Sequence, residues 1–105
     1  MTVIDVPTDF GGALELLRAG HRVTRTGWRV PGKWLVLVPG SSITITEGRP
    51  LGDAAPELVG RQVTYRAHVD IFNADGEVVP WAPSQSDILA RDWVPVDGHI
   101  KGDSP

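Results

Sequence analysis

Residues 10–25, FGGALELLRAGHRVTR, contain the change in periodicity that decides the fold. The apolar residues of the first part recur at the spacing of one helix face: Phe10, Ala13, Leu14 and Leu17. Thr8 or Asp9 can cap the start of this helix, and Gly20 stands where a residue with a left-handed backbone often ends one. From His21 to Arg25 the pattern alternates instead. The stretch therefore predicts a helix up to Gly20 and a strand after it.

The next segments on the C-terminal side are further predicted strands and turns. Residues 34–38, WLVLV, are all apolar, which is typical of a central strand buried on both faces. Residues 39–42, PGSS, indicate a turn, and residues 43–46, ITIT, alternate again. Residues 47–60 are rich in Gly and Pro, so we expect a surface loop there with room for one helical turn.

A β-hairpin is predicted in the second half of the chain. Residues 63–72 alternate as one strand, and Asn73–Gly76 turn the chain with the Asp-Gly pair that hairpins favour. Residues 77–81 then return as the second strand.

The C-terminal part adds one short helix and one strand. Ser84 can cap a helix that runs to Ala90, with Asp87 at its third position as in a capping box. Residues 93–96 close the pattern as a last strand. Together these elements predict an α+β fold, in which one N-terminal helix packs on a mostly antiparallel sheet of about five short strands.

The composition limits the possible partners. With 105 residues we expect a single domain over residues 1–97 and a flexible polar tail over residues 98–105. The net charge of -3 argues against a nucleic-acid polymer, which needs a basic face, but not against a small anionic ligand. The chain has no cysteine, no secretory signal at its start and no apolar run near the roughly 20 residues that span a membrane. We therefore expect a cytoplasmic protein with no membrane partner.

Residues for metal binding or catalysis form no recognisable set. The three histidines (His21, His68 and His99) lack the spacing of metal ligands and have no cysteine to help them, so we expect no metal and no cofactor. His68 and Asp70 share a strand face, which suits either an acid–base pair or a half-exposed polar surface. The PGSS segment lacks the lysine of a P-loop and is either a plain turn or one whose amides face a phosphate. We predict no catalytic residue and no enzymatic activity.

Two clusters of aromatic and polar residues favour a binding function. In residues 25–29, RTGWR, Trp28 lies near Arg25 and Arg29 after a predicted strand. This pattern suits a stacked base with its phosphates, and equally a Trp that covers the core at a strand end. Residues 81–93, WAPSQSDILARDW, place two indoles beside hydroxyl, amide and carboxylate groups. They could hold a planar polar ligand, or they could be core anchors beside turn residues.

The order of several short motifs resembles the Thoeris anti-defence two family, a small phage and prophage domain. The motifs are ALELLRAG (13–20), GW (27–28), PGSS (39–42), RAHVD (66–70), ADG (74–76), VPW (79–81) and SQSDILARDW (84–93). The resemblance covers residues 9 to 96, and its closing motif is the most specific. The chain departs from the family pattern in the basic, stiffer RVPGK segment after Trp28 and in the loop 47–60.

The resemblance implies a sponge and not an enzyme. Family members look like helix-on-sheet protomers assembled into homo-oligomers, commonly tetramers. They hold cyclic nucleotide immune signals unmodified: cyclised ADP-ribose isomers of Thoeris defence and, in some members, cyclic dinucleotides of CBASS defence. The implied ligand-binding residues are Trp28 and Trp81 as aromatic walls, Ser84, Gln85 and Asp87 as polar contacts, and Arg25 or Arg29 for the phosphates.

Two rival interpretations stay open at this stage. The first is a hydrolase that cleaves the same signals with His68 and Asp70. The second is a structural or interaction module of a phage particle, in which the tryptophans serve only the core.

Overall fold

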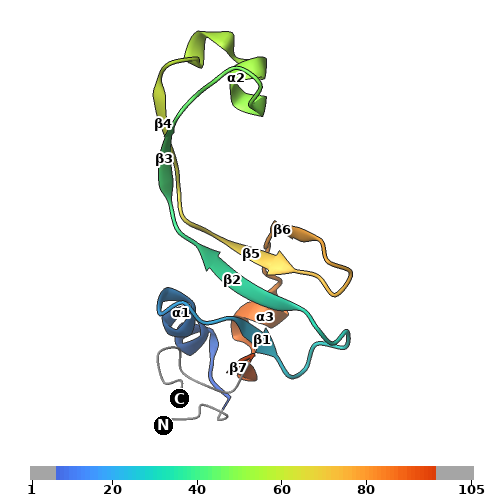
Figure 1. The fold of residues 1–105 in the computed structure, drawn as a ribbon. Coiled ribbons are helices and arrows are strands. Elements are labelled where there is room, and N and C mark those ends of the chain that lie inside the picture. Colours follow the sequence, from blue (N-terminus) through green and yellow to red (C-terminus); the bar gives the residue numbers. More distant parts are fainter. Residues whose placement is uncertain (1–6, 97–105) are drawn as a thin grey trace, which may run out of the picture. The chain divides into compact units, whose positions relative to one another are not determined.

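The helix and the strand predicted from residues 10–25 are both present in the computed structural model, which describes residues 7–96 (Figure 1). Helix α1 covers Phe10–Arg18 and strand β1 covers Val23–Arg25. Asp9 is the N-cap, because its Oδ1 accepts a hydrogen bond of 2.9 Å from the Gly12 amide. Gly20 follows the helix with a φ of 94°, a backbone conformation that favours glycine.

Five strands form the main sheet, in the spatial order β6-β5-β2-β1-β7. Its other members are β2 (Trp34–Val38), β5 (His68–Phe72), β6 (Val78–Pro80) and β7 (Trp93–Pro95). β1 pairs antiparallel with β2 and with β7, and β5 pairs antiparallel with β6. Helix α3 (Gln85–Leu89) leads into the edge strand β7. The predicted α+β class, the hairpin and the short capped helix are therefore confirmed.

The core lies between α1 and this sheet. Its fully buried members are Ala13, Leu17, Val23, Leu35 and Trp93. Trp93 is the largest of them and makes ring contacts with three further aromatic side chains. Truncating such a buried tryptophan typically costs about 3–5 kcal/mol. The second indole of the WAPSQSDILARDW stretch is therefore a core anchor.

The central strand is less buried than predicted. β2 is the middle strand of the sheet, as expected, but Leu35 is its only fully buried residue. Leu35 belongs to the core cluster that α1 covers, whereas Trp34 is covered by the stacked ring of Phe72, with centroids 4.7 Å apart, and by the Arg22 guanidinium. Since side chains and not a helix cover Trp34, the residue stays partly exposed.

Residues 63–72 form two strands, so the prediction of one continuous strand is wrong. β4 (Gln62–Tyr65) pairs with β3 (Ser41–Thr44) in a separate two-stranded sheet, while β5 belongs to the main sheet. The predicted turn at residues 39–42 is also wrong in its second half, because Ser41 and Ser42 pair with Tyr65 and Thr64. The turn preference of the PGSS residues was therefore weaker than strand pairing with partners more than twenty positions away.

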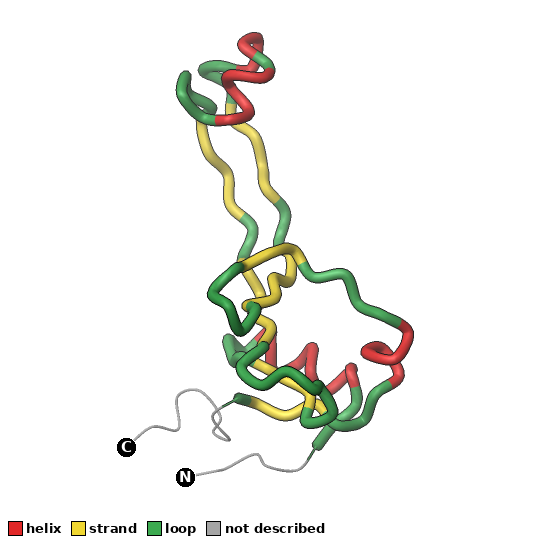
Figure 2. The backbone as a smooth tube through the Cα atoms, turned by 90° about the vertical axis from the view of Figure 1, so that its right-hand side faces the viewer, coloured by secondary structure: helices red, strands yellow, loops and turns green. Residues whose placement is uncertain are grey.

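The segment between β3 and β4 contains two short helices, α2 (Pro50–Ala54) and the 3-10 helix η1 (Pro56–Leu58). Each begins with a proline, whose fixed φ suits the first helical position. Ile45 is buried here, and its amide and carbonyl bond to residues 61 and 60. The predicted loop with one helical turn therefore has more structure than expected. Figure 2 shows β3 and β4 side by side.

The chain separates into two compact units, one of Pro39–His68 and one of the remaining described residues. A single domain over residues 1–97 stays a prediction, and the tail expected at 98–105 lies outside the described residues. Among residues 7–96, no helix is long and apolar enough to cross a membrane.

Candidate functional site

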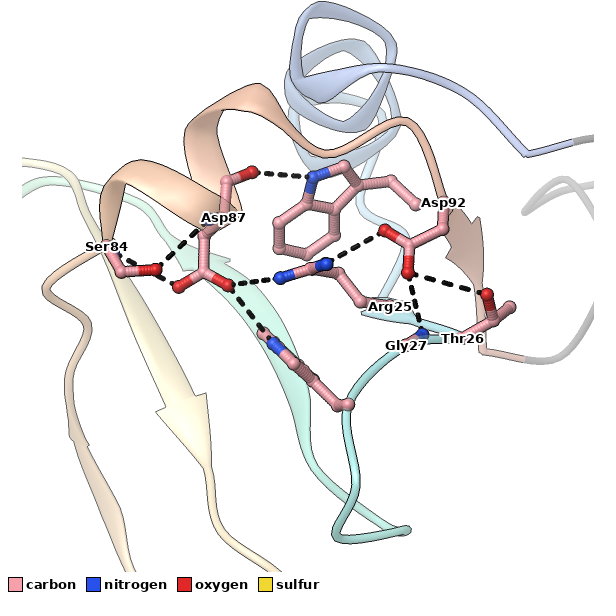
Figure 3. A network of polar contacts seen from close by, with 8 residues as sticks. Arg25, Thr26, Gly27, Ser84, Asp87 and Asp92 are labelled. Carbon is pink, nitrogen blue, oxygen red and sulfur yellow. Dashed lines mark hydrogen bonds and ion pairs between the residues drawn. The ribbon is translucent and has the colours of Figure 1, made fainter.

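Arg25, the last residue of β1, is held between two carboxylates (Figure 3). Its Nε donates to Asp92 Oδ1 over 2.8 Å, and its Nη1 donates to Asp87 Oδ1 over 2.9 Å. The three side chains are only 13–26% exposed, so water screens these ion pairs weakly. The hydrogen bond that Arg25 donates to Asp92 is the largest cause that raises the pKa of Arg25. The guanidinium is thus charged and fixed in one orientation.

Asp87 connects α3 to this arginine and to Trp28. Its Oδ2 accepts from the Ser84 amide, and the Ser84 hydroxyl accepts from the Asp87 amide, which completes the predicted capping box. Its Oδ1 also accepts from Trp28 Nε1 over 3.1 Å. Burial alone would raise the pKa of Asp87, but hydrogen bonds from Ser84, Arg25 and Trp28 outweigh it and lower that pKa. The carboxylate already takes three of the roughly four hydrogen bonds that it can accept.

Asp92 holds the turn after β1. Its Oδ2 accepts from the Gly27 amide over 2.7 Å, and the Thr26 hydroxyl lies 3.5 Å away. A Cβ at position 27 would lie 2.6 Å from that oxygen, so any larger residue would push the Asp92 carboxylate away from its bonds to Gly27 and Arg25. Burial would raise the pKa of Asp92, but the bonds from Arg25 and Gly27 lower it. Asp92 therefore fixes both Arg25 and the backbone that carries Trp28.

The Trp28 indole lies against the core without being enclosed by it. Its ring meets that of Trp93 nearly edge to face, with centroids 5.4 Å apart, and it remains partly exposed. Trp81 meets Trp93 in a similar way at 6.0 Å and also contacts Phe10. Trp93 Nε1 donates to the Asp87 carbonyl oxygen. Two partly exposed indoles, Trp28 and Trp81, therefore flank one buried indole.

The structure brings together four of the seven predicted site residues directly: Arg25, Trp28, Ser84 and Asp87. Trp81 joins them through Trp93. Arg29 and Gln85 are exposed and form no hydrogen bond or ion pair with the others in the part of the chain that is described. We refer to Arg25, Trp28, Asp87 and Asp92 as the Arg25 cluster.

Two residues of this region were missed as site candidates. Asp92 lies in the SQSDILARDW motif, directly before the core tryptophan. This position in the most specific motif could have identified it as a site candidate. Lys33 places its Nζ 4.8 Å from the centroid of the Trp28 ring. Only its basic character in the RVPGK segment could have drawn attention to it.

His68, considered above for acid–base chemistry, is not a member of the Arg25 cluster. His68 begins β5, and its Nδ1 is 3.2 Å from the Arg66 carbonyl oxygen. No group of three or more His, Cys, Asp or Glu side chains that could hold a metal ion occurs among residues 7–96.

Fold and site together define a small α+β protein, with an arginine clamped by two carboxylates beside partly exposed indoles. The Thoeris anti-defense 2-like domain family matches residues 8–96, and the chain belongs to that family. A curated relative, Thoeris anti-defense 2 of Bacillus phage SP01, is 34% identical over 84 residues, which are 80% of this chain and 89% of that protein. The resemblance seen in the motifs is confirmed, and membership supports an anti-defence role.

Proposed function

We propose that this protein binds and sequesters cyclic nucleotide immune signals without cleaving them. The ligands are cyclised ADP-ribose isomers of Thoeris defence, with cyclic dinucleotides of CBASS defence as a second class. One observation carries the proposal beyond the family name: the partly exposed Trp28 indole is fixed through its Nε1 to Asp87. A fixed aromatic face is what a nucleobase needs for stacking.

The energetics of this arrangement favour binding. Stacking of a base on one aromatic side chain contributes roughly 1–3 kcal/mol. Because Asp87 already orients the ring, little side-chain freedom is lost when a ligand arrives. Arg25 holds Asp87 and Asp92 in place, and its role in this proposal is to order the site.

The proposal includes the assembly and the place of action. A chain of 105 residues has little interior to spare for a private cavity, so a deep site is easier to build from two protomers. We propose a homo-oligomer, a tetramer by family resemblance, that acts in the cytoplasm of the bacterial host. Sequestration needs affinity alone, so the proposal requires no catalytic residue.

Calorimetric titration with a cyclised ADP-ribose isomer and with cyclic dinucleotides tests the proposal, if the ligand is then recovered by heating. Tight binding and release of intact ligand would support sequestration. A linearised product would support the hydrolase with His68 and Asp70. No binding of any signal would contradict the proposal and favour a structural module.

Substitution of the indole tests whether this region is the site. Trp28→Ala should weaken binding at least about fivefold, the lower end of the value of one stacked base. Trp34→Ala is the matched control, because Trp34 is also partly exposed but stacks on Phe72 outside the Arg25 cluster. Equal losses of affinity in both variants would remove Trp28 from the site.

A further inference from the structure

Lys33 places a positive charge at the proposed stacking face. Its Nζ lies 4.8 Å from the centroid of the Trp28 ring, within the range of a cation–π contact. Its main chain is held separately, since the Thr24 hydroxyl donates to the Lys33 carbonyl oxygen over 2.7 Å. The backbone at this position is therefore anchored, while the side chain lies on the ring.

The charges around Trp28 give this lysine a particular importance. Arg25, Asp87 and Asp92 together carry one positive and two negative charges. This net negative charge would repel an anionic ligand. The Nε and Nη1 of Arg25 already donate hydrogen bonds to the two carboxylates. Lys33 forms no ion pair and donates no side-chain hydrogen bond among residues 7–96. Its ammonium therefore lies at the ring without a carboxylate partner among these residues.

We propose that Lys33 recognises the phosphate of the ligand by exchanging its cation–π contact with Trp28 for an ion pair with that phosphate. In this proposal the nucleobase stacks on the ring face that the ammonium covers, so it displaces the ammonium. The flexible four-carbon stem lets the released ammonium pair with a phosphate of the same ligand. This inference rests on the proposed function and adds the residue that selects for charge.

The exchange predicts selectivity for phosphate-bearing ligands. An uncharged nucleoside must displace the ammonium but has no phosphate with which the ammonium can pair. A nucleotide replaces the cation–π contact with a charge-assisted hydrogen bond, which is the stronger of the two. Removal of the ammonium should therefore weaken the binding of a nucleotide without weakening the binding of an uncharged nucleoside.

Lys33→Met tests this directly, because it keeps an unbranched apolar stem and leaves the main-chain bond from Thr24 available. For a cyclised ADP-ribose isomer, which bears a diphosphate, we expect binding about tenfold weaker and less dependent on salt. For adenosine, followed by the NMR shift of the Trp28 indole N–H, we expect binding equal to wild type or up to about threefold tighter. Lys33→Arg should keep most of the affinity for the anionic ligand.

Arg18→Met provides the control for net charge. Arg18 pairs with Glu15 on α1, and its loss changes the charge of the protein by the same amount. It should change neither affinity by more than about twofold. Equal effects of Lys33→Met and Arg18→Met, or an equal loss for both ligands in Lys33→Met, would overturn the role of Lys33 while the proposed function stands. If the wild type binds neither ligand, the proposed function and this inference fail together.

Discussion

Replacing Arg25 by methionine removes the only group that bonds both Asp87 and Asp92 in the described structure. Each of its two charge-assisted hydrogen bonds contributes about 1.5–3 kcal/mol, and breaking one partner of a buried pair costs about 3–5 kcal/mol. The side chains here are 13–26% exposed, which favours the lower end. We expect Arg25→Met to lower the free energy of unfolding by about 3 kcal/mol, or the melting temperature by about 15 °C.

Urea unfolding followed by tryptophan fluorescence measures this loss. The matched control is Arg18→Met, because the Arg18–Glu15 pair is 65% and 78% exposed and should contribute less than about 0.5 kcal/mol. The pH dependence gives a second check. A protonated carboxyl group forms no ion pair with Arg25 and carries no charge that needs a partner. The difference in free energy of unfolding between wild type and Arg25→Met should therefore shrink below about pH 4. A loss under about 1 kcal/mol at pH 7, or no larger than that of Arg18→Met, would refute the role of this clamp.

Three further predictions concern the same region. Gly27→Ala places a Cβ 2.6 Å from Asp92 Oδ2 and should cost about 1–3 kcal/mol in urea unfolding; an unchanged midpoint would contradict the close approach. Ser84→Ala loses the N-cap of α3 and should cost about 1 kcal/mol, whereas Ser86→Ala, two residues further on and outside the capping box, should change stability by less than about 0.5 kcal/mol. Since the folded pKa of Asp92 lies below its ordinary value of 3.8, its contribution is complete above that value and is lost as the pH falls through the folded pKa. Asp92→Asn should therefore flatten the acid limb of the stability curve, and an unaltered limb would show that Asp92 does not contribute to it.

The sequence predicted the elements whose signals are local. Helix α1 follows from apolar spacing between a capping residue and Gly20, and the β5–β6 hairpin follows from the Asp-Gly turn, where Gly76 has a φ of 93°. The capping box of α3 was readable from Ser84 and Asp87 alone. These features depend on neighbours a few positions away, so a single chain is enough to reveal them.

The two-stranded sheet could not be predicted in the same way. The PGSS segment has the residues of a turn, yet Ser41 and Ser42 lie in β3 because β4 offers them partners. The continuous alternation of residues 63–72 likewise gave no sign that the chain leaves one sheet and enters another between Tyr65 and His68. Strand pairing satisfies backbone groups across long separations, and periodicity carries no information about the partner.

For the site, the sequence by itself determined which chemical groups are present and, through the motif order, the family. It placed an arginine and an indole after a strand, and hydroxyl, amide and carboxylate groups around a short helix. Only the tertiary structure decided that Arg25 meets Asp87 and Asp92, which lie 62 and 67 positions further along the chain. Pairing of β1 with β7 creates that meeting, because it sets Arg25 opposite Trp93 and next to the carboxylate before it.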